Sequence, residues 1–397
     1  MTREEVRKEV LDIPNPHILL ELPTSFGKTK LGLDRMVSVL GKKKTPKILI
    51  VIPRVVLIDN WKEEFKKWKL EGMLKYVKFS TYVSVPKATN VGKWDVVIFD
   101  ECHHLSERCQ EALTYYDIKN VIALSATVKR DVKDRLTSLY PDMYLYKVSM
   151  KEAIDEEILP DPKVYLIPLA LATGVPTETI IKNPKGKGNI DTCWANRWSV
   201  IKQKQYKVTI YCTQQQYMED LDAQIEWFKM KYMRTRKDVF KNKWLKLCSD
   251  RLKWLSEKKN AYMKTLLDRL DKERTLTFCS SISQTEELGE HCINSKNKTS
   301  DKVRKDFNEG KINHITACNM LNEGMNLVNC RVGLYANLNS SETIIKQRLG
   351  RILRHKDPII IIPYYKGTRE EELVQTMLED YNPELVTVVT SLNEVKL

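Results

Sequence analysis

Gly27, Lys28 and Thr29 stand between a short apolar segment at 17–22 and a stretch whose apolar residues recur at helical spacing. Where a strand turns into a helix, backbone N–H groups and the helix dipole can hold phosphates. Lys28 would then contact the outer phosphates of a nucleotide, and the Thr29 hydroxyl would hold Mg²⁺. The strict phosphate-loop pattern has a glycine where Leu22 stands, so an ordinary turn remains the alternative for this segment alone.

A second group able to do chemistry ends the apolar segment at 94–100, where Asp100 and Glu101 are adjacent. A carboxylate at a strand end can bind Mg²⁺, and its neighbour can orient and deprotonate an attacking water. Single acidic residues at strand ends are common, but Asp-Glu-Cys-His after an apolar strand is not. The two segments together predict a phosphate site in which Thr29 and Asp100 bind the metal.

The first part of the chain alternates short β-branched segments with helical stretches, which is typical of parallel strands joined by crossover helices. A basic amphipathic helix is expected at 59–68. Prolines then interrupt the pattern, so we expect a first domain at 1–159 and a boundary near 159–161. The expected strands of this domain lie at 17–22, 47–52, 94–100 and 120–126.

The second part of the chain resumes this alternation only after a long stretch rich in Lys and Arg. We expect a second α/β domain at 160–397 that contains a mainly helical insertion at about 170–268. The aromatic residues of the insertion recur at helical spacing, so they are interpreted first as its core and second as base-stacking groups. The expected strands after the insertion lie at 274–280, 313–320, 330–338 and 358–365.

The charge of the chain indicates the kind of partner. Its 397 residues carry a formal net charge of +14, which favours nucleic acid or an acidic membrane surface. No apolar run reaches the roughly 18 to 20 residues that span a bilayer, and the polar start lacks a secretory core, so we expect a soluble cytoplasmic protein. The nine cysteines include no Cys-x-x-Cys pair, which favours buried thiols over a structural metal or disulfides.

Four segments occur in the order in which superfamily 2 helicases carry them, and the sequence resembles that family. They are 27–29, 100–103, 125–127 and 347–354. The resemblance is closest to the DNA-directed branch that includes phage recombination helicases and restriction motor subunits. It implies two RecA-like domains, ATP and Mg²⁺ as cofactors, and an ATPase that moves along or unwinds nucleic acid, with DNA favoured over RNA.

The resemblance also implies roles for individual residues. Arg351 and Arg354 resemble arginine fingers that reach the γ-phosphate from the second domain, with Gln347 at the same interface and Glu101 activating water. The residues implied to link hydrolysis to nucleic acid are His103, His104, Ser125 and Thr127. Those implied to bind nucleotide are Ser25, Phe26, Gly27, Lys28, Thr29, Lys30, Gly324 and Asn326. Those implied to contact nucleic acid are Arg54, Thr81, Tyr82, Ser280 and Ser281.

The sequence departs from the family pattern at three places. Ser25 replaces a usual glycine, and Asn326 replaces a usual aspartate that would contact ribose. The first glutamine of the chain is Gln110, so the upstream glutamine that reads adenine in many relatives is missing. A guanine-reading Asn-Lys-x-Asp motif is also missing. ATP is therefore expected from the resemblance alone.

Other functions remain as alternatives. RNA unwinding needs the same motifs as DNA unwinding. A non-catalytic nucleic-acid-binding scaffold would be expected to lose a group that acts on the γ-phosphate, and these groups are present. A switch protein that binds other proteins would leave the second-domain arginines and the basic insertion unexplained. We expect a monomer that binds nucleic acid and no membrane.

Overall fold

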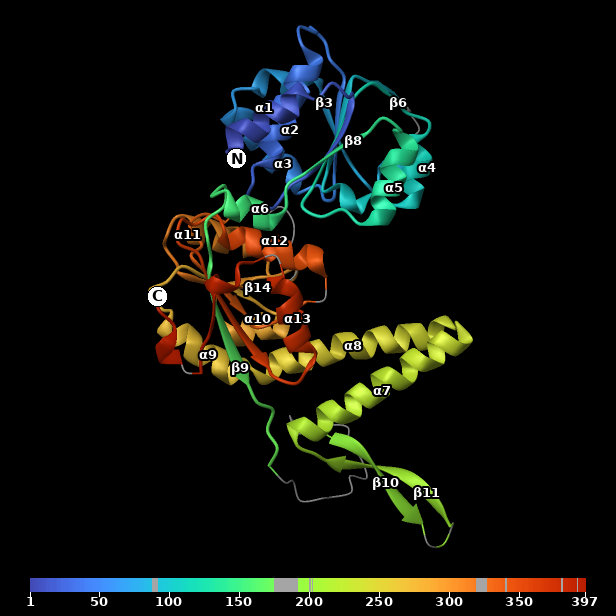
Figure 1. Ribbon diagram of the computed structural model, residues 1–397, viewed down its shortest axis with the longest axis vertical. Helices are drawn as coiled ribbons and strands as arrows, with labels where there is room; N and C mark the ends of the chain where they lie inside the picture. Colours follow the sequence, from blue (N-terminus) through green and yellow to red (C-terminus); the bar gives the residue numbers. More distant parts are fainter. Residues whose placement is uncertain are drawn as a thin grey trace.

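The computed structural model describes residues 1–87, 92–174, 192–199, 201, 203–318, 327–339, 341–379, 381–390 and 392–397. Two α/β domains are stacked along the long axis of the molecule, and a long helical hairpin extends sideways from the second (Figure 1). This arrangement confirms the predicted fold class. No helix in the described ranges is long and apolar enough to cross a membrane.

The first domain is built on a six-stranded parallel sheet with the order β3-β2-β5-β7-β1-β8. Its central strands are buried along almost their whole length, as expected for strands covered on both faces. The strands are β1 (His17–Glu21), β2 (Ile48–Ile52), β3 (Val77–Thr81), β5 (Val96–Asp100), β7 (Val121–Ser125) and β8 (Tyr144–Lys147). A small separate sheet pairs β4 (Lys93–Trp94) with β6 (Asp117–Ile118).

Helices cover both faces of this sheet with separate apolar clusters. One cluster takes side chains from α1 (Arg3–Asp12), α2 (Lys28–Leu40) and α3 (Leu57–Lys67). The other takes them from α4 (Glu107–Leu113) and α5 (Arg130–Leu139). The remaining helices are α6 (Met150–Asp155), η1 (Glu71–Tyr76), η2 (Val85–Lys87) and η3 (Cys102–His104).

The second domain has a seven-stranded parallel sheet with the order β13-β14-β12-β15-β16-β9-β17. Its strands are β9 (Lys163–Leu169), β12 (Thr275–Phe278), β13 (Cys292–Ile293), β14 (His314–Ala317), β15 (Val332–Tyr335), β16 (Ile359–Tyr365) and β17 (Val386–Val388). Its helices are α9 (Asn260–Arg269), α10 (Ile282–Leu288), α11 (Ser300–Asn308), α12 (Glu342–Ile352), α13 (Arg369–Leu378), η5 (Pro383–Leu385) and η6 (Leu392–Glu394).

The segment between β9 and α9 forms the sideways extension. Helices α7 (Gln214–Thr235) and α8 (Asp238–Lys258) pair as a hairpin, which we call the arm (Figure 1). Strands β10 (Thr192–Ser199) and β11 (Lys204–Tyr211) precede the arm as an antiparallel pair. The insertion is mainly helical, as predicted, but this strand pair was not expected from the sequence.

The sheet order brings the predicted segments of the first domain together. Strands β5, β7 and β1 are neighbours, and all run parallel. Their carboxyl ends therefore lie at one edge of the sheet, where ligands of such folds usually bind. The turn before α2, the pair Asp100 and Glu101, and Ser125 all stand at this edge.

Candidate nucleotide site

The turn between β1 and α2 has the backbone of a phosphate loop. Gly27 precedes the first helical residue with φ 104° and ψ 28°, a conformation that glycine adopts at little cost. No side chain caps the N-terminus of the helix there, so its first N–H groups are directed towards a possible anion. Ser25 also has a positive φ of 69°. This explains the usual glycine at that position, because a left-handed non-glycine residue costs roughly 1 kcal/mol.

Lys28 lies half-buried at the start of α2, and its ammonium folds over its own loop. Nζ donates to the carbonyl oxygens of Leu22 at 3.2 Å and Pro23 at 3.4 Å. Burial lowers the pKa of Lys28, and the carboxylates of Glu101 and Asp100 oppose that shift. The lysine is therefore held beside both carboxylates, with backbone oxygens in the place of phosphate oxygens.

Three neighbours of Lys28 have different surroundings. Thr29 is half-buried in the first turn of α2. The Phe26 side chain is 4% exposed and belongs to the core, so only its backbone faces the loop. Lys30 pairs with Asp34, and its Nζ lies 4.4 Å from the Trp68 ring centroid. That position on the outer side of α2 does not favour the predicted nucleotide contact of Lys30.

Asp100 ends β5 in an apolar setting. Its Oδ2 accepts a hydrogen bond of 2.9 Å from Trp61 Nε1, and its backbone oxygen accepts one of 2.8 Å from the Tyr82 hydroxyl. Burial, together with the neighbouring charge of Glu101, raises the pKa of Asp100 to about 6. Trp61 is a residue that sequence reasoning missed. The signal was the apolar spacing of Leu57, Trp61 and Phe65, which indicates a buried helix face but not a carboxylate partner.

Glu101 turns the chain away from β5 with a left-handed backbone of φ 49° and ψ 55°. Its Oε2 is buried and accepts no hydrogen bond from the described residues, and His103 Nδ1 lies 3.4 Å away. Burial raises the pKa of Glu101, but His103 and the charge of Lys28 outweigh burial, so the pKa lies below its usual value. A buried carboxylate that keeps its charge can hold and orient a water.

A short hydrogen-bond chain connects β5 to β7. His103 Nδ1 lies 3.0 Å from Ser125 Oγ, and the Ser125 hydroxyl donates to the Thr127 carbonyl oxygen at 2.8 Å. Since the serine proton is used there, Ser125 accepts from His103, whose proton is then on Nδ1. The His104 ring centroid lies 4.4 Å from that of His103 and 6.0 Å from that of Tyr82.

Helix α12 of the second domain lies directly on the phosphate loop of the first. The Ser25 hydroxyl donates to the Gly350 carbonyl oxygen, and Arg354 Nε donates to Ser25 Oγ at 3.2 Å. A Cβ added at Gly350 would overlap the Thr24 side chain and lie 3.2 Å from its Cα. Only glycine therefore fits at this contact between two domains.

Arg351 of α12 also lies near Lys28 and Glu101. Burial, and then the charge of Arg354, lowers the pKa of Arg351 to about 9, while Glu101 opposes the shift. The structure thus brings Lys28, Glu101 and Arg351 together from two domains. Gln347 lies on α12, but its side chain is outside the described part, as are Gly324 and Asn326 altogether.

Arg348 of the same helix has a packing position that the sequence did not reveal. It is 2% exposed, donates to the Asn337 carbonyl oxygen at 2.9 Å, and lies 5.1 Å from the Phe278 ring centroid. Its burial lowers its pKa. Arg348 therefore fixes α12 to its own sheet while Arg351 and Arg354 reach the other domain.

The residues expected to contact nucleic acid are at strand ends of both sheets. Arg54 is exposed after β2, and Thr81, which ends β3, lies 2.8 Å through Oγ1 from Ser84 Oγ. Ser280 and Ser281 follow β12, where Ser281 caps α10. Tyr82 is only 6% exposed. Its interior position under Asp100 does not favour the predicted nucleic-acid contact.

Comparison with known proteins assigns the family. Residues 4–130 match the family described as "Type III restriction enzyme, res subunit", and residues 258–356 match "Helicase conserved C-terminal domain". With two RecA-like domains and these two matches, the chain belongs to the superfamily 2 helicases.

Individual relatives cover only parts of the chain or share only its fold. The chain is 34% identical over 149 residues to DNA 3'-5' translocase XPB2 of Sulfurisphaera tokodaii, which is 34% of this chain and 32% of that protein. It is 29% identical over 159 residues to putative helicase 161L of Invertebrate iridescent virus 6, which is 34% of each. The chain thus spans about a third of these relatives. S. cerevisiae Dbp5 bound to RNA and ADP BeF3 matches with a TM-score of 0.58 at 12% identity, over 98% of this chain and 89% of that one.

Proposed function

We propose that the protein is an ATP-dependent DNA translocase that separates or remodels DNA strands. The observation that supports this most is the meeting of Lys28 and Glu101 from one domain with Arg351 from the other. A site divided in this way is complete only when the domains are closed. Hydrolysis can then depend on anything that closes them, such as a strand lying across both domains.

The residues at the sheet edge fit a nucleotide and Mg²⁺. The uncapped start of α2 provides N–H groups for phosphates, and Lys28 exchanges its carbonyl contacts for phosphate oxygens. Thr29 and Asp100 supply the oxygen ligands that Mg²⁺ prefers. Bound Mg²⁺ would neutralise charge on the β- and γ-phosphates.

The roles of the other groups follow from their surroundings. Glu101 holds and deprotonates the attacking water, because its carboxylate is buried beside Lys28 and keeps its charge. Arg351 and Arg354 stabilise the negative charge that develops on the γ-phosphate. His103 contacts both Glu101 and Ser125, and Ser125 contacts Thr127. This chain would link a change at Glu101 during hydrolysis to the residues proposed to bind nucleic acid.

DNA is favoured over RNA as the strand. The family described for restriction enzymes and the relative named a DNA translocase support DNA, and the net charge of +14 suits either polymer. RNA remains the second candidate, because a structure with this fold is described as bound to RNA. Contacts through hydroxyls, backbone and Arg54 would read phosphates and carry little sequence preference.

The proposal is tested by phosphate release from ATP, measured with no polymer, with single-stranded DNA, with forked DNA and with RNA. Strong stimulation by DNA is expected, because a bound strand favours the closed site. Lys28→Ala should remove the stimulated rate, whereas the exposed Lys42→Ala should leave it unchanged. Stimulation by RNA alone would make RNA the substrate in place of DNA. No hydrolysis with any polymer would support a non-catalytic nucleic-acid-binding scaffold.

A further inference from the structure

The outer end of the arm concentrates positive charge. We call residues 227–246 the arm tip. Within it lie Lys229, Lys231, Arg234, Arg236, Lys237, Lys241, Lys243 and Lys246, against the one acidic residue Asp238. The half of α7 nearer the second domain is the reverse, with Glu219, Asp220, Asp222 and Glu226 and no Lys or Arg. A solvated helix usually mixes its charges, so this separation along one hairpin indicates a polyanion at the tip.

The arm tip also exposes apolar side chains beyond those that hold its helices together. Tyr232 and Trp244 stack between α7 and α8 with ring centroids 6.2 Å apart and form the packing of the hairpin. Trp227 is 47% exposed, Met230 51% and Val239 76%. The Trp227 ring meets Phe228 and Phe240 edge to face, and Lys231 Nζ lies 5.3 Å from its centroid, so a cation and a half-exposed aromatic ring occur together. Such a pair suits an exposed base or base pair.

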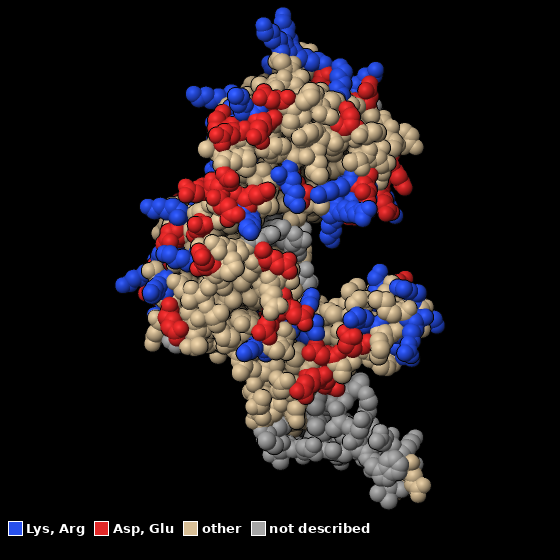
Figure 2. Space-filling view, in the orientation of Figure 1, with Lys and Arg blue, Asp and Glu red and all other residues tan. Residues whose placement is uncertain are grey.

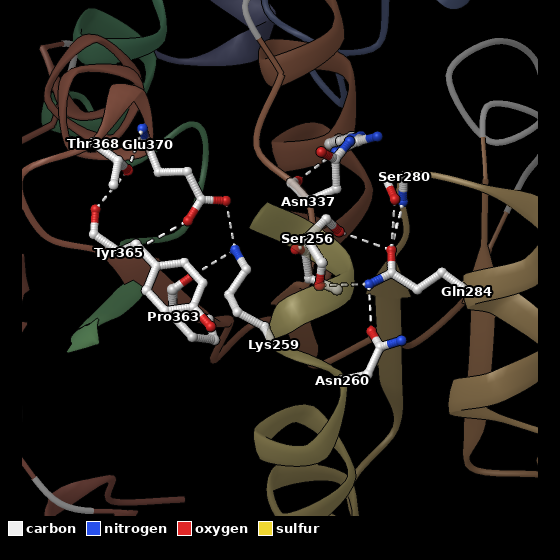
Figure 3. Close-up of polar contacts among 12 residues, drawn as sticks. Ser256, Lys259, Asn260, Ser280, Gln284, Asn337, Pro363, Tyr365, Thr368 and Glu370 are labelled. Atoms are coloured by element: carbon white, nitrogen blue, oxygen red, sulfur yellow. Dashed lines mark hydrogen bonds and ion pairs between the residues drawn. The ribbon is translucent and has the colours of Figure 1, made fainter. Parts of the chain in front are cut away.

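The inner end of the arm is fixed to the second domain by buried polar contacts (Figure 3). The fully buried Lys259 donates to Glu370 Oε1 at 2.7 Å and to the Pro363 carbonyl oxygen at 3.0 Å. The Gln284 side-chain amide donates to the Ser256 carbonyl oxygen at 2.9 Å, and the Ser256 hydroxyl donates to Gln284 Oε1 at 2.8 Å. Residues 238–255 of α8 extend about 25 Å beyond this anchor.

The same buried contacts also involve residues beside those proposed to bind nucleic acid. Ser280 donates from its backbone nitrogen to Gln284 Oε1 at 2.8 Å. The Ser256 hydroxyl also lies 2.8 Å from the Ala336 carbonyl oxygen and shares its one proton between this oxygen and Gln284 Oε1. These contacts lie at the ends of β12 and β15. The arm is therefore held in a fixed direction relative to the residues proposed to hold the single strand.

Space for a second nucleic-acid contact lies between the arm and the first domain. Figure 2 shows a hollow there, with Lys and Arg side chains on the arm and on the side of the first domain that faces it. In the first domain, Lys129 and Arg130 are exposed at the start of α5, which lies on the arm side in Figure 1. Positive charge on two sides of a hollow attracts a polyanion.

We propose that the arm tip is a second DNA-binding site that holds the duplex part of a fork or junction while the single strand crosses the two domains. The lysines and arginines contact phosphates of the duplex, and Trp227 with Met230 lies against the base pair exposed where the strands part. This proposal rests on the proposed function for its substrate. It adds that forked DNA is bound in preference to a plain single strand.

The test is equilibrium binding of a forked duplex, a blunt duplex and a single strand of equal length, followed by fluorescence anisotropy over a range of salt concentrations. The variant Arg236→Gln/Lys237→Gln removes two exposed charges from the tip. For the fork, the slope of log affinity against log salt should fall by about two, and affinity at 0.1 M salt should fall roughly tenfold for each lost contact. Single-strand binding should change little.

The matched control is Lys42→Gln/Lys44→Gln, which removes two exposed charges from the loop after α2, at the opposite edge of the first sheet. Equal losses in the tip and control variants, or equal losses for fork and single strand, would overturn the proposal. Trp227→Ala should lower affinity for the fork more than for the blunt duplex, and equal effects would contradict the role of Trp227 at the parting base pair.

Failure of this proposal is distinguishable from failure of the proposed function. Tip variants should retain phosphate release stimulated by a single strand, because the tip is remote from the nucleotide. Tip-dependent binding of the fork without any hydrolysis would support the second site and contradict the motor. Hydrolysis with no preference for the fork would support the motor and contradict the second site.

Discussion

Two adjacent carboxylates differ because their surroundings differ. The pKa of Asp100 is raised to about 6 by burial and by Glu101, whereas the pKa of Glu101 lies below its usual value beside His103 and Lys28. Groups whose pKa values are moved apart in this way are suited to different roles in one site. This difference supports the proposal that Asp100 binds the metal and Glu101 the attacking water.

Glu101→Gln tests the assignment of the base. Gln keeps the shape of the side chain but cannot take a proton, so ATP binding should persist while turnover falls by about 10² to 10⁴. Binding is followed by fluorescence of a labelled nucleotide and turnover by phosphate release. Glu111→Gln, in an exposed position of α4, is the control and should behave as the unchanged protein. Turnover near normal in Glu101→Gln would remove Glu101 from the mechanism.

The raised pKa of Asp100 predicts a pH dependence of the Mg²⁺ requirement. Above pH 6 Asp100 is charged and can bind the metal, and as pH falls through about 6 its proton competes with Mg²⁺. The Mg²⁺ concentration that gives half-maximal hydrolysis should therefore rise, approaching tenfold for each pH unit below 6. It should stay nearly constant from pH 7 to 8.

Trp61→Phe makes this pH prediction specific to Asp100. The indole hydrogen bond to Asp100 lowers its pKa, so removing it should move the acid limit to higher pH. Trp68→Phe removes a similar indole hydrogen bond, to the half-buried Glu64, and should leave the acid limit in place. An acid limit that is the same in both variants would assign it to another group.

At the scale of elements, the apolar strands were predictable and the polar or interrupted ones were not. The four strands predicted for the first domain all correspond to strands of its sheet, because each is centred on consecutive apolar residues that are buried. Strand β8 was missed since its residues are largely exposed at the sheet edge. Strand β9 contains Pro168, and a proline argues against a central strand. Strand β9 nevertheless pairs with β16 on one side and with β17 on the other.

The site was predictable where one segment carries the chemistry and not where distant segments meet. The proximity of Lys28 and Asp100 was predictable, because both follow parallel strands and the carboxyl ends of parallel strands lie at one edge of a sheet. The contact between Ser25 and Gly350 joins residues far apart in sequence, and no local pattern indicates it. The buried positions of Tyr82 and Arg348 depend on tertiary packing and could likewise not be predicted from the sequence.

Gly350→Ala tests the contact between α12 and the phosphate loop. Its methyl group would overlap Thr24, so the domains should be unable to close and stimulated hydrolysis should fall at least about tenfold. Nucleotide binding to the first domain should be kept, and the unfolding temperature should change little because the added group lies between domains. Gly72→Ala, where nothing lies near the added carbon, is the control. Full activity of Gly350→Ala would mean that the closed contact is not the active one.

At the scale of the whole molecule, the two domains meet at the proposed nucleotide site, and the second domain carries the arm. Helix α12 is fixed to its own sheet by Arg348 and to the other domain through Gly350 and Arg354. The arm is fixed to the same domain through Lys259 and Ser256. On the proposed function, opening and closing of the domains would therefore move the arm tip relative to the first domain, together with any DNA bound there.

The central claim is that hydrolysis needs the second domain to complete the site of the first. The most direct measurement is the rate of phosphate release from ATP with saturating single-stranded DNA, in the unchanged protein and in Arg351→Ala, with Arg369→Ala at the partly exposed start of α13 as control. The stimulated rate should fall about 10³-fold or more in Arg351→Ala, with nucleotide and DNA still bound, and should not fall in the control. A DNA-stimulated rate that survives in Arg351→Ala would contradict the central claim.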